Sequence, residues 1–180
     1  MPRKSKPAAP GSPVDIEAMI RVDHAGEYGA VRIYEGQLAV LKRRKSASVE
    51  TIQHMADQEQ RHLRTFDRLV NERRVRPTAL EPVWRVAGFA LGAVTAAMGE
   101  KAAFACTAAV EEVIDEHYAR QVEALGDAEP GLKAALEEFR ANEQEHRDAA
   151  LAQGGGDAPA PLSAAIKAGT RLAIWLSTRL

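Results

Sequence analysis

Two pairs of residues with the spacing Glu-x-x-His are the clearest chemical feature of this 180-residue sequence: Glu59 with His62, and Glu143 with His146. Residues three positions apart lie on one face of a helix, with their Cβ atoms about 5–6 Å apart, which is close enough to hold one metal ion. The spacing alone is a weak signal, so its meaning depends on where each pair lies on its helix.

Both pairs interrupt stripes of apolar residues that are expected to face a helical core. The stripes have steps of three and four residues and contain Ile52, Met55, Phe66 and Leu69 around the first pair, and Leu132, Leu136, Phe139 and Ala150 around the second. Burying a carboxylate without a partner is costly. The pattern therefore predicts that these Glu and His side chains pair with one another or bind a metal ion.

An internal repeat adds two further carboxylates to the candidate site. Glu27 lies 32 positions before Glu59, and Glu111 lies 32 positions before Glu143. Glu112 is the competing candidate, but it falls outside the apolar stripe that contains Glu111. The sequence thus indicates two helical hairpins, 84 positions apart, each supplying one Glu and one Glu-x-x-His pair.

Four carboxylates and two imidazoles from four helices are the ligand set of ferritin-like di-iron or di-manganese proteins. Oxygen ligands with some imidazole suit iron or manganese better than copper or zinc. Six ionisable residues also exceed what a bundle needs merely to fix its helix register. The predicted metal ligands are Glu27, Glu59, His62, Glu111, Glu143 and His146. Such a centre could store iron, disproportionate peroxide or activate dioxygen.

The elements that must position these residues are predicted to be helices. The composition is 46% hydrophobic but only 5% aromatic, and alanine, the best helix former, supplies much of the apolar fraction. Short breaks, all but the first containing glycine or proline, separate predicted helices at 14–44, 48–76, 82–125, 132–153 and 162–180. This pattern predicts an all-α fold, a ferritin-like four-helix bundle with an additional C-terminal amphipathic helix.

Length and composition predict one domain, 14–180, preceded by a disordered N-terminal tail, 1–13, that contains four prolines. The formal net charge of −1 gives no indication of nucleic-acid binding. The single cysteine, Cys106, excludes a disulfide framework. The longest uncharged run, 86–99, is shorter than the about 20 residues that a membrane-spanning helix needs, so no such span is expected.

The sequence resembles the demethoxyubiquinone hydroxylase family over roughly 14–180, and several segments carry this resemblance. They are IRVDHAGEYGAVRIYEGQLAVL (20–41), DQEQRHL (57–63), RVRPTALEPVW (74–84), GFALGA (88–93), ACTAAVEE (105–112) and RLAIWLSTRL (171–180). The resemblance implies a di-iron centre in which the six predicted ligands bind two iron ions. It also implies a monooxygenase that uses dioxygen to hydroxylate a demethoxy-polyprenylbenzoquinone intermediate in ubiquinone biosynthesis. The alternative is a ferritin-like iron-storage or iron-handling protein.

The resemblance also suggests residues that take part in electron delivery. A His-Tyr pair at His117 and Tyr118 matches one that is implicated in this role in the family, so both are candidate catalytic residues. For Tyr118, the other interpretation is an ordinary tyrosine at the edge of the core. Asp23 and His24 lie one turn before Glu27 and are candidates to hydrogen-bond the ligands, with a surface pair as the alternative. The expected electron donor is external, with NADH as the candidate.

The C-terminal helix, 162–180, combines apolar residues with Trp175 and flanking cations, which suits a membrane interface. The other interpretation is a fifth helix that packs on the bundle. A polyprenyl quinone resides in the bilayer, and an iron-storage protein has no use for such a helix. We therefore expect a peripheral membrane protein at the cytoplasmic face of a bacterial cell membrane, or alternatively on the matrix side of the mitochondrial inner membrane. Other ubiquinone-biosynthesis proteins are possible partners.

Overall fold

The computed structural model describes residues 14–180, and the predicted disordered tail, 1–13, lies outside this range. The described residues are all helical apart from turns and loops, as predicted. The helices are α1 (Ile16–Leu41), α2 (Val49–Arg73), α3 (Glu81–Met98), α4 (Glu100–Leu125), α5 (Pro130–Ala152) and α6 (Ala160–Ser177), with a short 3₁₀ turn, η1 (Gly155–Asp157), before α6.

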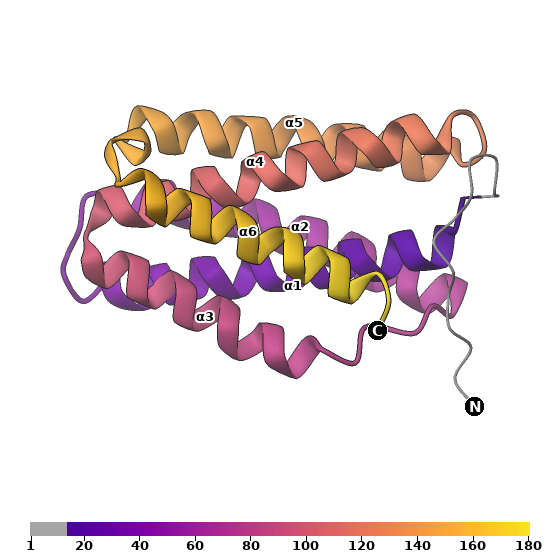
Figure 1. Cartoon of the computed structure of the whole chain (residues 1–180), viewed down its shortest axis with the longest axis horizontal. Helices are drawn as coiled ribbons and strands as arrows, with labels where there is room; N and C mark the ends of the chain where they lie inside the picture. Colours follow the sequence, from indigo (N-terminus) through magenta and orange to yellow (C-terminus); the bar gives the residue numbers. More distant parts are fainter. Residues whose placement is uncertain (1–13) are drawn as a thin grey trace.

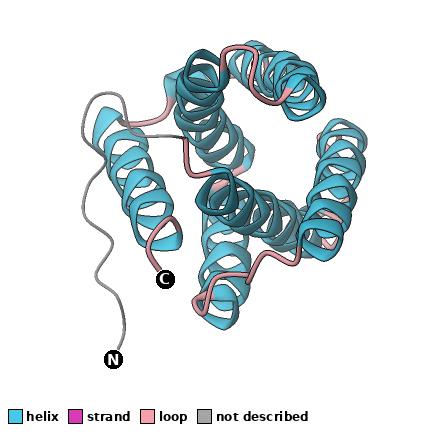
Figure 2. Ribbon diagram, turned by 90° about the vertical axis from the view of Figure 1, so that its right-hand side faces the viewer, coloured by secondary structure: helices cyan, strands magenta, loops and turns pink. Residues whose placement is uncertain are grey.

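Helices α1, α2, α4 and α5 form a four-helix bundle, which confirms the predicted architecture (Figure 1). In each hairpin one helix packs along the next, α1 with α2 and α4 with α5. Viewed from the end, α3 and α6 lie outside the bundle, α3 against α1 and α6 against α4 and α1 (Figure 2). The bundle therefore carries two additional helices rather than one.

The second additional helix arises from a break that the sequence pattern did not indicate. The predicted continuous helix over 82–125 is wrong, because it is divided at Gly99 into α3 and α4. Gly99 has φ +131°, a conformation that residues with a side chain rarely adopt. The guanidinium of Arg44 donates hydrogen bonds of 3.0 Å to the carbonyl oxygens of Ala96 and Ala97, which satisfies the end of α3.

Helix α3 lies so close to α1 that their backbones touch. A Cβ atom at Gly92 would overlap the carbonyl oxygen of Ile33, and one at Gly36 would overlap the carbonyl oxygen of Phe89. Glycine at these positions therefore permits the contact. The opposite face of α3 exposes large apolar side chains, Val83, Val86, Val94 and Met98.

The bundle core consists of two apolar clusters with polar residues between them. One cluster includes Ile20, Phe66, Ile114 and Phe139, and the other includes Leu38, Met55, Phe104 and Ala150. On every bundle helix, the predicted metal ligands lie between a member of the first cluster and a member of the second. The polar centre is thus closed at both ends by packed side chains.

Within 14–180, no helix is both long enough and apolar enough to cross a membrane.

Candidate metal centre

The six predicted ligands converge in the middle of the bundle. Helix α1 supplies Glu27 and α4 supplies Glu111, whereas α2 and α5 each supply a Glu-x-x-His pair. None of the six residues is more than 2% exposed. The two hairpins therefore place their equivalent residues around one buried point.

Two overlapping groups of ligand atoms share the same two glutamates. Glu59 and Glu143 form one group with Glu27 and His62 and another with Glu111 and His146, and within each group the ligand atoms all lie within 4.8 Å of one another. The Nδ1 atom of His62 lies 3.3 Å from Glu143, and that of His146 lies 3.1 Å from Glu59. This arrangement suits two ions bridged by the two shared carboxylates.

Buried polar atoms without a hydrogen-bond partner mark where the ions would bind. They include Oε2 of Glu27, Oε1 of Glu59, Oε2 of Glu111, both carboxylate oxygens of Glu143 and Nδ1 of both histidines. Each such atom costs roughly 1–3 kcal/mol when it is left unsatisfied. Metal ions would satisfy all of them, and the oxygen-rich donor set fits iron or manganese.

In the metal-free centre, burial and neighbouring charges favour the protonated forms of several predicted ligands. Burial raises the pKa of Glu27 to about 8 and that of Glu111 well above its usual range. Burial opposes ionisation of Glu59 too, but His146 and His62 outweigh it and lower the pKa to about 2. Burial also disfavours the charged form of His146, yet Glu143 and Glu59 raise its pKa to about 9. Binding of metal ions must therefore displace protons.

Two buried tyrosines hold carboxylates of the centre from the opposite hairpin. The Tyr34 hydroxyl on α1 donates to Oε1 of Glu111 on α4 at 2.8 Å, and the Tyr118 hydroxyl on α4 donates to Glu27 on α1. Burial raises the pKa of both hydroxyls well above the usual range, so both remain donors. Tyr118 is a predicted candidate, whereas this role of Tyr34 was not predicted, although Tyr34 precedes Tyr118 by the same 84 positions that separate the hairpins.

The other candidate catalytic residue, His117, lies outside the cluster. Its Nε2 atom is 3.1 Å from Oδ1 of Asp23, which also accepts a 2.8 Å hydrogen bond from Gln121. The side chain of His117 is 15% exposed, whereas that of Asp23 is fully buried. The two residues of the pair therefore differ: Tyr118 contacts a predicted ligand, whereas His117 contacts Asp23 and is partly exposed.

Two other candidates take different partners. Nε2 of His24 lies 2.9 Å from Oδ1 of Asp67 on α2, and Asp23 contacts His117 and Gln121. Among the described residues, neither side chain therefore makes a hydrogen bond to a predicted ligand. Lys167 on α6 pairs with Glu112 at 2.6 Å. Only Glu111 of the two adjacent glutamates is brought into the cluster.

A family model described as "Ubiquinone biosynthesis protein COQ7" matches residues 14–177. This chain belongs to the COQ7 family. The resemblance predicted from the sequence is thereby confirmed, and the match covers every helix of the bundle as well as α3 and α6.

Curated relatives of this COQ7-family chain extend over nearly its whole length. A 3-demethoxyubiquinol 3-hydroxylase from Rhodospirillum rubrum is 58% identical over 176 residues, which is 97% of this chain and 82% of the relative. The human protein named NADPH-dependent 3-demethoxyubiquinone 3-hydroxylase, mitochondrial, is 50% identical over 92% of this chain and 78% of its own length. The 5-demethoxyubiquinone hydroxylase, mitochondrial, of Saccharomyces cerevisiae is 38% identical over 92% of this chain and 78% of the relative.

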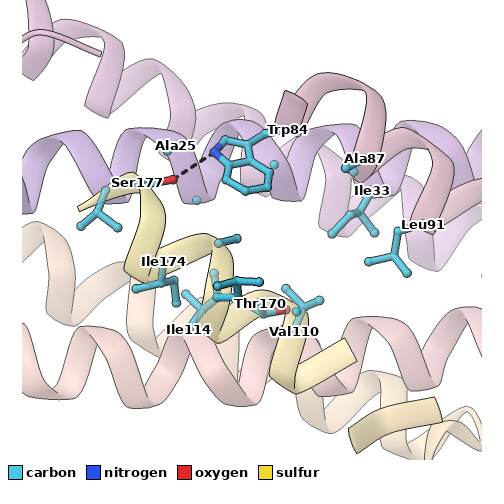
Figure 3. A pocket seen from close by; sticks show the side chains of 17 residues that line it. Ala25, Ile33, Trp84, Ala87, Leu91, Val110, Ile114, Thr170, Ile174 and Ser177 are labelled. Atoms are coloured by element: carbon cyan, nitrogen blue, oxygen red, sulfur yellow. Dashed lines mark hydrogen bonds between the residues drawn. The ribbon is translucent and has the colours of Figure 1, made fainter. Parts of the chain in front are cut away.

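The COQ7-family fold also contains a partly open apolar cavity of about 430 Å³ between α1, α3, α4 and α6 (Figure 3). Trp84 on α3 and Ser177 on α6 meet across it through a 3.0 Å hydrogen bond from the indole N–H to the hydroxyl (Figure 3). Its other lining residues are mostly apolar or glycine, including Ile33, Leu91 and Ile114.

Helices α1 and α4 each contribute residues both to this cavity and to the metal centre. On α1 the cavity is lined by Gly26, the neighbour of Glu27, and on α4 by Val110, the neighbour of Glu111. A Cβ atom at Gly26 would meet only Ile114 within 4 Å, at 3.9 Å, and one at Gly29 would meet nothing. The glycines therefore leave open space on the side of α1 that lines the cavity.

Proposed function

We propose that this chain is a di-iron monooxygenase that hydroxylates a demethoxy-polyprenylbenzoquinone intermediate of ubiquinone biosynthesis, using dioxygen. Relatives that cover nearly the whole chain carry the names 3-demethoxyubiquinol 3-hydroxylase and 3-demethoxyubiquinone 3-hydroxylase. The observation that carries the proposal is the pair of ligand groups sharing Glu59 and Glu143, with an apolar cavity beside it.

The six predicted ligands would hold the two iron ions. Glu27 and His62 would hold one ion together with Glu59 and Glu143, and Glu111 and His146 would hold the other together with the same two glutamates. When bound, the iron ions supply the redox chemistry with dioxygen. Tyr34 and Tyr118 fix the orientation of two carboxylates, and the apolar clusters on both sides exclude water from the centre.

The cavity between α3 and α6 is the proposed site for the quinone. Its apolar lining suits an isoprenoid chain, and the lining includes Gly26, the neighbour of the predicted ligand Glu27, so the ring could lie close to the centre. His117 and Tyr118 are proposed to deliver electrons from an external donor. Because the human relative's name specifies NADPH, the donor should be tested as NADPH beside the NADH expected from the sequence.

Peripheral membrane attachment is supported by exposed apolar residues on α3 and α6, two of the four helices that line the cavity. Val86 and Met98 on α3 are 64% and 61% exposed, and Leu172 and Trp175 on α6 are 56% and 52% exposed. Helix α6 also packs inward through Ile166 and Ser177, so it both covers the bundle and presents an apolar outer face. We propose attachment at the cytoplasmic face of a bacterial membrane, with the mitochondrial matrix face as the alternative. Other ubiquinone-biosynthesis proteins remain predicted partners.

The test is hydroxylation by the purified protein loaded with ferrous iron. A demethoxyquinone, a reductant and ¹⁸O₂ should give a product that carries one labelled oxygen, detected by mass spectrometry. The alternative, iron storage, predicts instead that the protein accumulates ferric iron well beyond two ions per chain and forms no hydroxylated quinone. That second result would overturn the proposal.

A further inference from the structure

Each histidine of the centre points its outer ring nitrogen at a side-chain amide from the other hairpin. Nε2 of His62 on α2 lies 3.0 Å from Oδ1 of Asn142 on α5, and Nε2 of His146 on α5 lies 2.7 Å from Oε1 of Gln58 on α2. The opposite nitrogens, Nδ1, face the carboxylates and have no hydrogen-bond partner. In both rings, therefore, Nε2 points to an amide of the opposite helix and Nδ1 points to the centre.

The two amide contacts cross between helices in a reciprocal way. Gln58 immediately precedes Glu59, and Asn142 immediately precedes Glu143, so the two amide residues are 84 positions apart like the other paired residues of the centre. Each helix thus supplies a shared carboxylate, a histidine and the acceptor for the histidine of its partner. Helices α2 and α5 otherwise make few contacts, so these bonds also connect them.

The chemistry of an amide acceptor determines which nitrogen is free for a metal ion. An amide oxygen only accepts, so Nε2 must carry a proton, and in a neutral imidazole this leaves the lone pair on Nδ1. The amide is also neutral. It fixes the ring without adding a fifth negative charge beside four glutamates, which a carboxylate acceptor would do.

We propose that Gln58 and Asn142 are positioning residues that hold His146 and His62 with Nδ1 toward the ions and tie α2 to α5. This inference rests on the metal centre of the proposed function. It assigns to the two amides no contact with substrate or with the ions.

Cobalt(II) is a suitable probe because it binds to iron sites and shifts the proton resonances of its ligands. Replacing one amide, as Gln58→Leu or Asn142→Leu, is expected to weaken cobalt binding about 10- to 100-fold. In proton NMR of the cobalt-loaded wild-type protein, we expect two shifted, solvent-exchangeable ring N–H resonances. Each leucine variant should lose one of them through faster exchange with water.

Conservative variants and a matched control separate positioning from general damage to the fold. Gln58→Glu and Asn142→Asp keep an acceptor and should retain both N–H resonances. Gln144→Leu removes an amide from α5 that donates to Asp115 at 2.9 Å, and it should bind cobalt like the wild type. Circular dichroism checks helicity. If a leucine variant does not fold, the N–H resonances of the conservative variant of the same residue test the inference.

Leucine variants with wild-type affinity and both N–H resonances would overturn the inference, and so would loss of a resonance in the conservative variants. A wild-type protein that binds no cobalt and no ferrous iron would instead overturn the metal centre itself, and the inference with it. The two failures are therefore distinguishable.

Discussion

Tyr34 donates its hydrogen bond to Glu111 from the other hairpin, with 2.8 Å between the hydroxyl and Oε1. Tyr118 returns the equivalent bond to Glu27. The two hairpins therefore exchange hydrogen bonds at the carboxylates that belong to only one ligand group each. Both bonds are buried, so each stabilises the bundle and fixes a predicted ligand at the same time.

Replacing Tyr34 by Phe should destabilise the metal-loaded protein by about 1–3 kcal/mol, because Glu111 keeps a buried oxygen without its donor. Urea unfolding measures the difference. Tyr28→Phe, at a half-buried position on the same helix, is the matched control and should change little. Equal effects of the two substitutions would show that the bond to Glu111 contributes nothing specific.

Replacing Glu111 by Ala should abolish hydroxylation and reduce the bound iron, whereas Glu112→Ala should preserve both. Glu111 is 1% exposed and belongs to a ligand group, whereas Glu112 pairs with Lys167 near the surface. Iron content by elemental analysis and product formation by mass spectrometry are the measurements. Similar losses in both variants would mean that the register of α4 is assigned incorrectly.

The metal-free protein should lose stability as pH rises from 5 to 8. The pKa of Glu27 is raised to about 8 and that of His146 to about 9, so the folded state binds protons more tightly than the unfolded state. The resulting stabilisation is lost as pH rises through these values. Glu59, with a pKa lowered to about 2, contributes oppositely, but its effect is already complete above its ordinary pKa of 4.5.

Thermal melting of chelator-treated protein across this pH range tests the expectation. Added iron should raise the melting temperature more at pH 8 than at pH 5, because the ions replace protons that are bound less tightly at the higher pH. In Glu27→Gln the pH dependence should become shallower. A melting temperature that climbs from pH 5 to pH 8 without metal would contradict the charge balance described for the centre.

Filling the cavity at Gly29 should impair the enzyme without affecting its metal. Gly29→Leu adds a side chain where a Cβ atom meets nothing within 4 Å, so the fold should tolerate it. We expect kcat/KM for a long-chain demethoxyquinone to fall about tenfold or more, equivalent to ~1.4 kcal/mol. Gly131→Leu, at a similarly open glycine outside the cavity, is the control. Unchanged kinetics in Gly29→Leu would exclude this cavity as the quinone site.

Charges on the outer face of α6 should release the protein from lipid. Replacing Leu172 and Trp175 by Glu removes two exposed apolar side chains, each worth roughly 1.5–3 kcal/mol when buried. Flotation with anionic lipid vesicles should show at least about a tenfold loss of binding. Leu151→Glu, at a residue 47% exposed on α5, should bind like the wild type. If the double variant still floats fully, α3 becomes the candidate anchor.

The six candidate ligands could be predicted because each property that identifies them is periodic. Helical spacing places Glu59 with His62 on one face, and the repeat selects Glu27 and Glu111. The hydrogen bonds that orient the two histidines could not be predicted in the same way. Gln58 and Asn142 are ordinary polar residues until the opposite helix brings a histidine to them.

The break between α3 and α4 was missed for a different reason. One glycine within a helical pattern costs only about 1 kcal/mol relative to alanine, so Gly99 alone does not predict a helix end. What makes the break favourable is the long-range contact of α3 with α1, where Gly92 permits the backbones to touch. A contact between segments more than 50 positions apart leaves no local signal in the sequence.

Once Gly99 separates α3 from α4, the chain resembles a tandem duplication of one three-helix unit. Helices α1 and α4 both contain 26 residues, and α3 and α6 both contain 18. Gln121 donates to Asp23 as Gln37 donates to Thr107; the two donors are 84 positions apart, and so are the two acceptors.

The two units differ at His117, because the equivalent position in the first unit is Ile33. A centre with perfect two-fold symmetry would have no preferred side for receiving electrons. With the proposed role of His117 in electron delivery, this difference would give the centre one side from which electrons arrive.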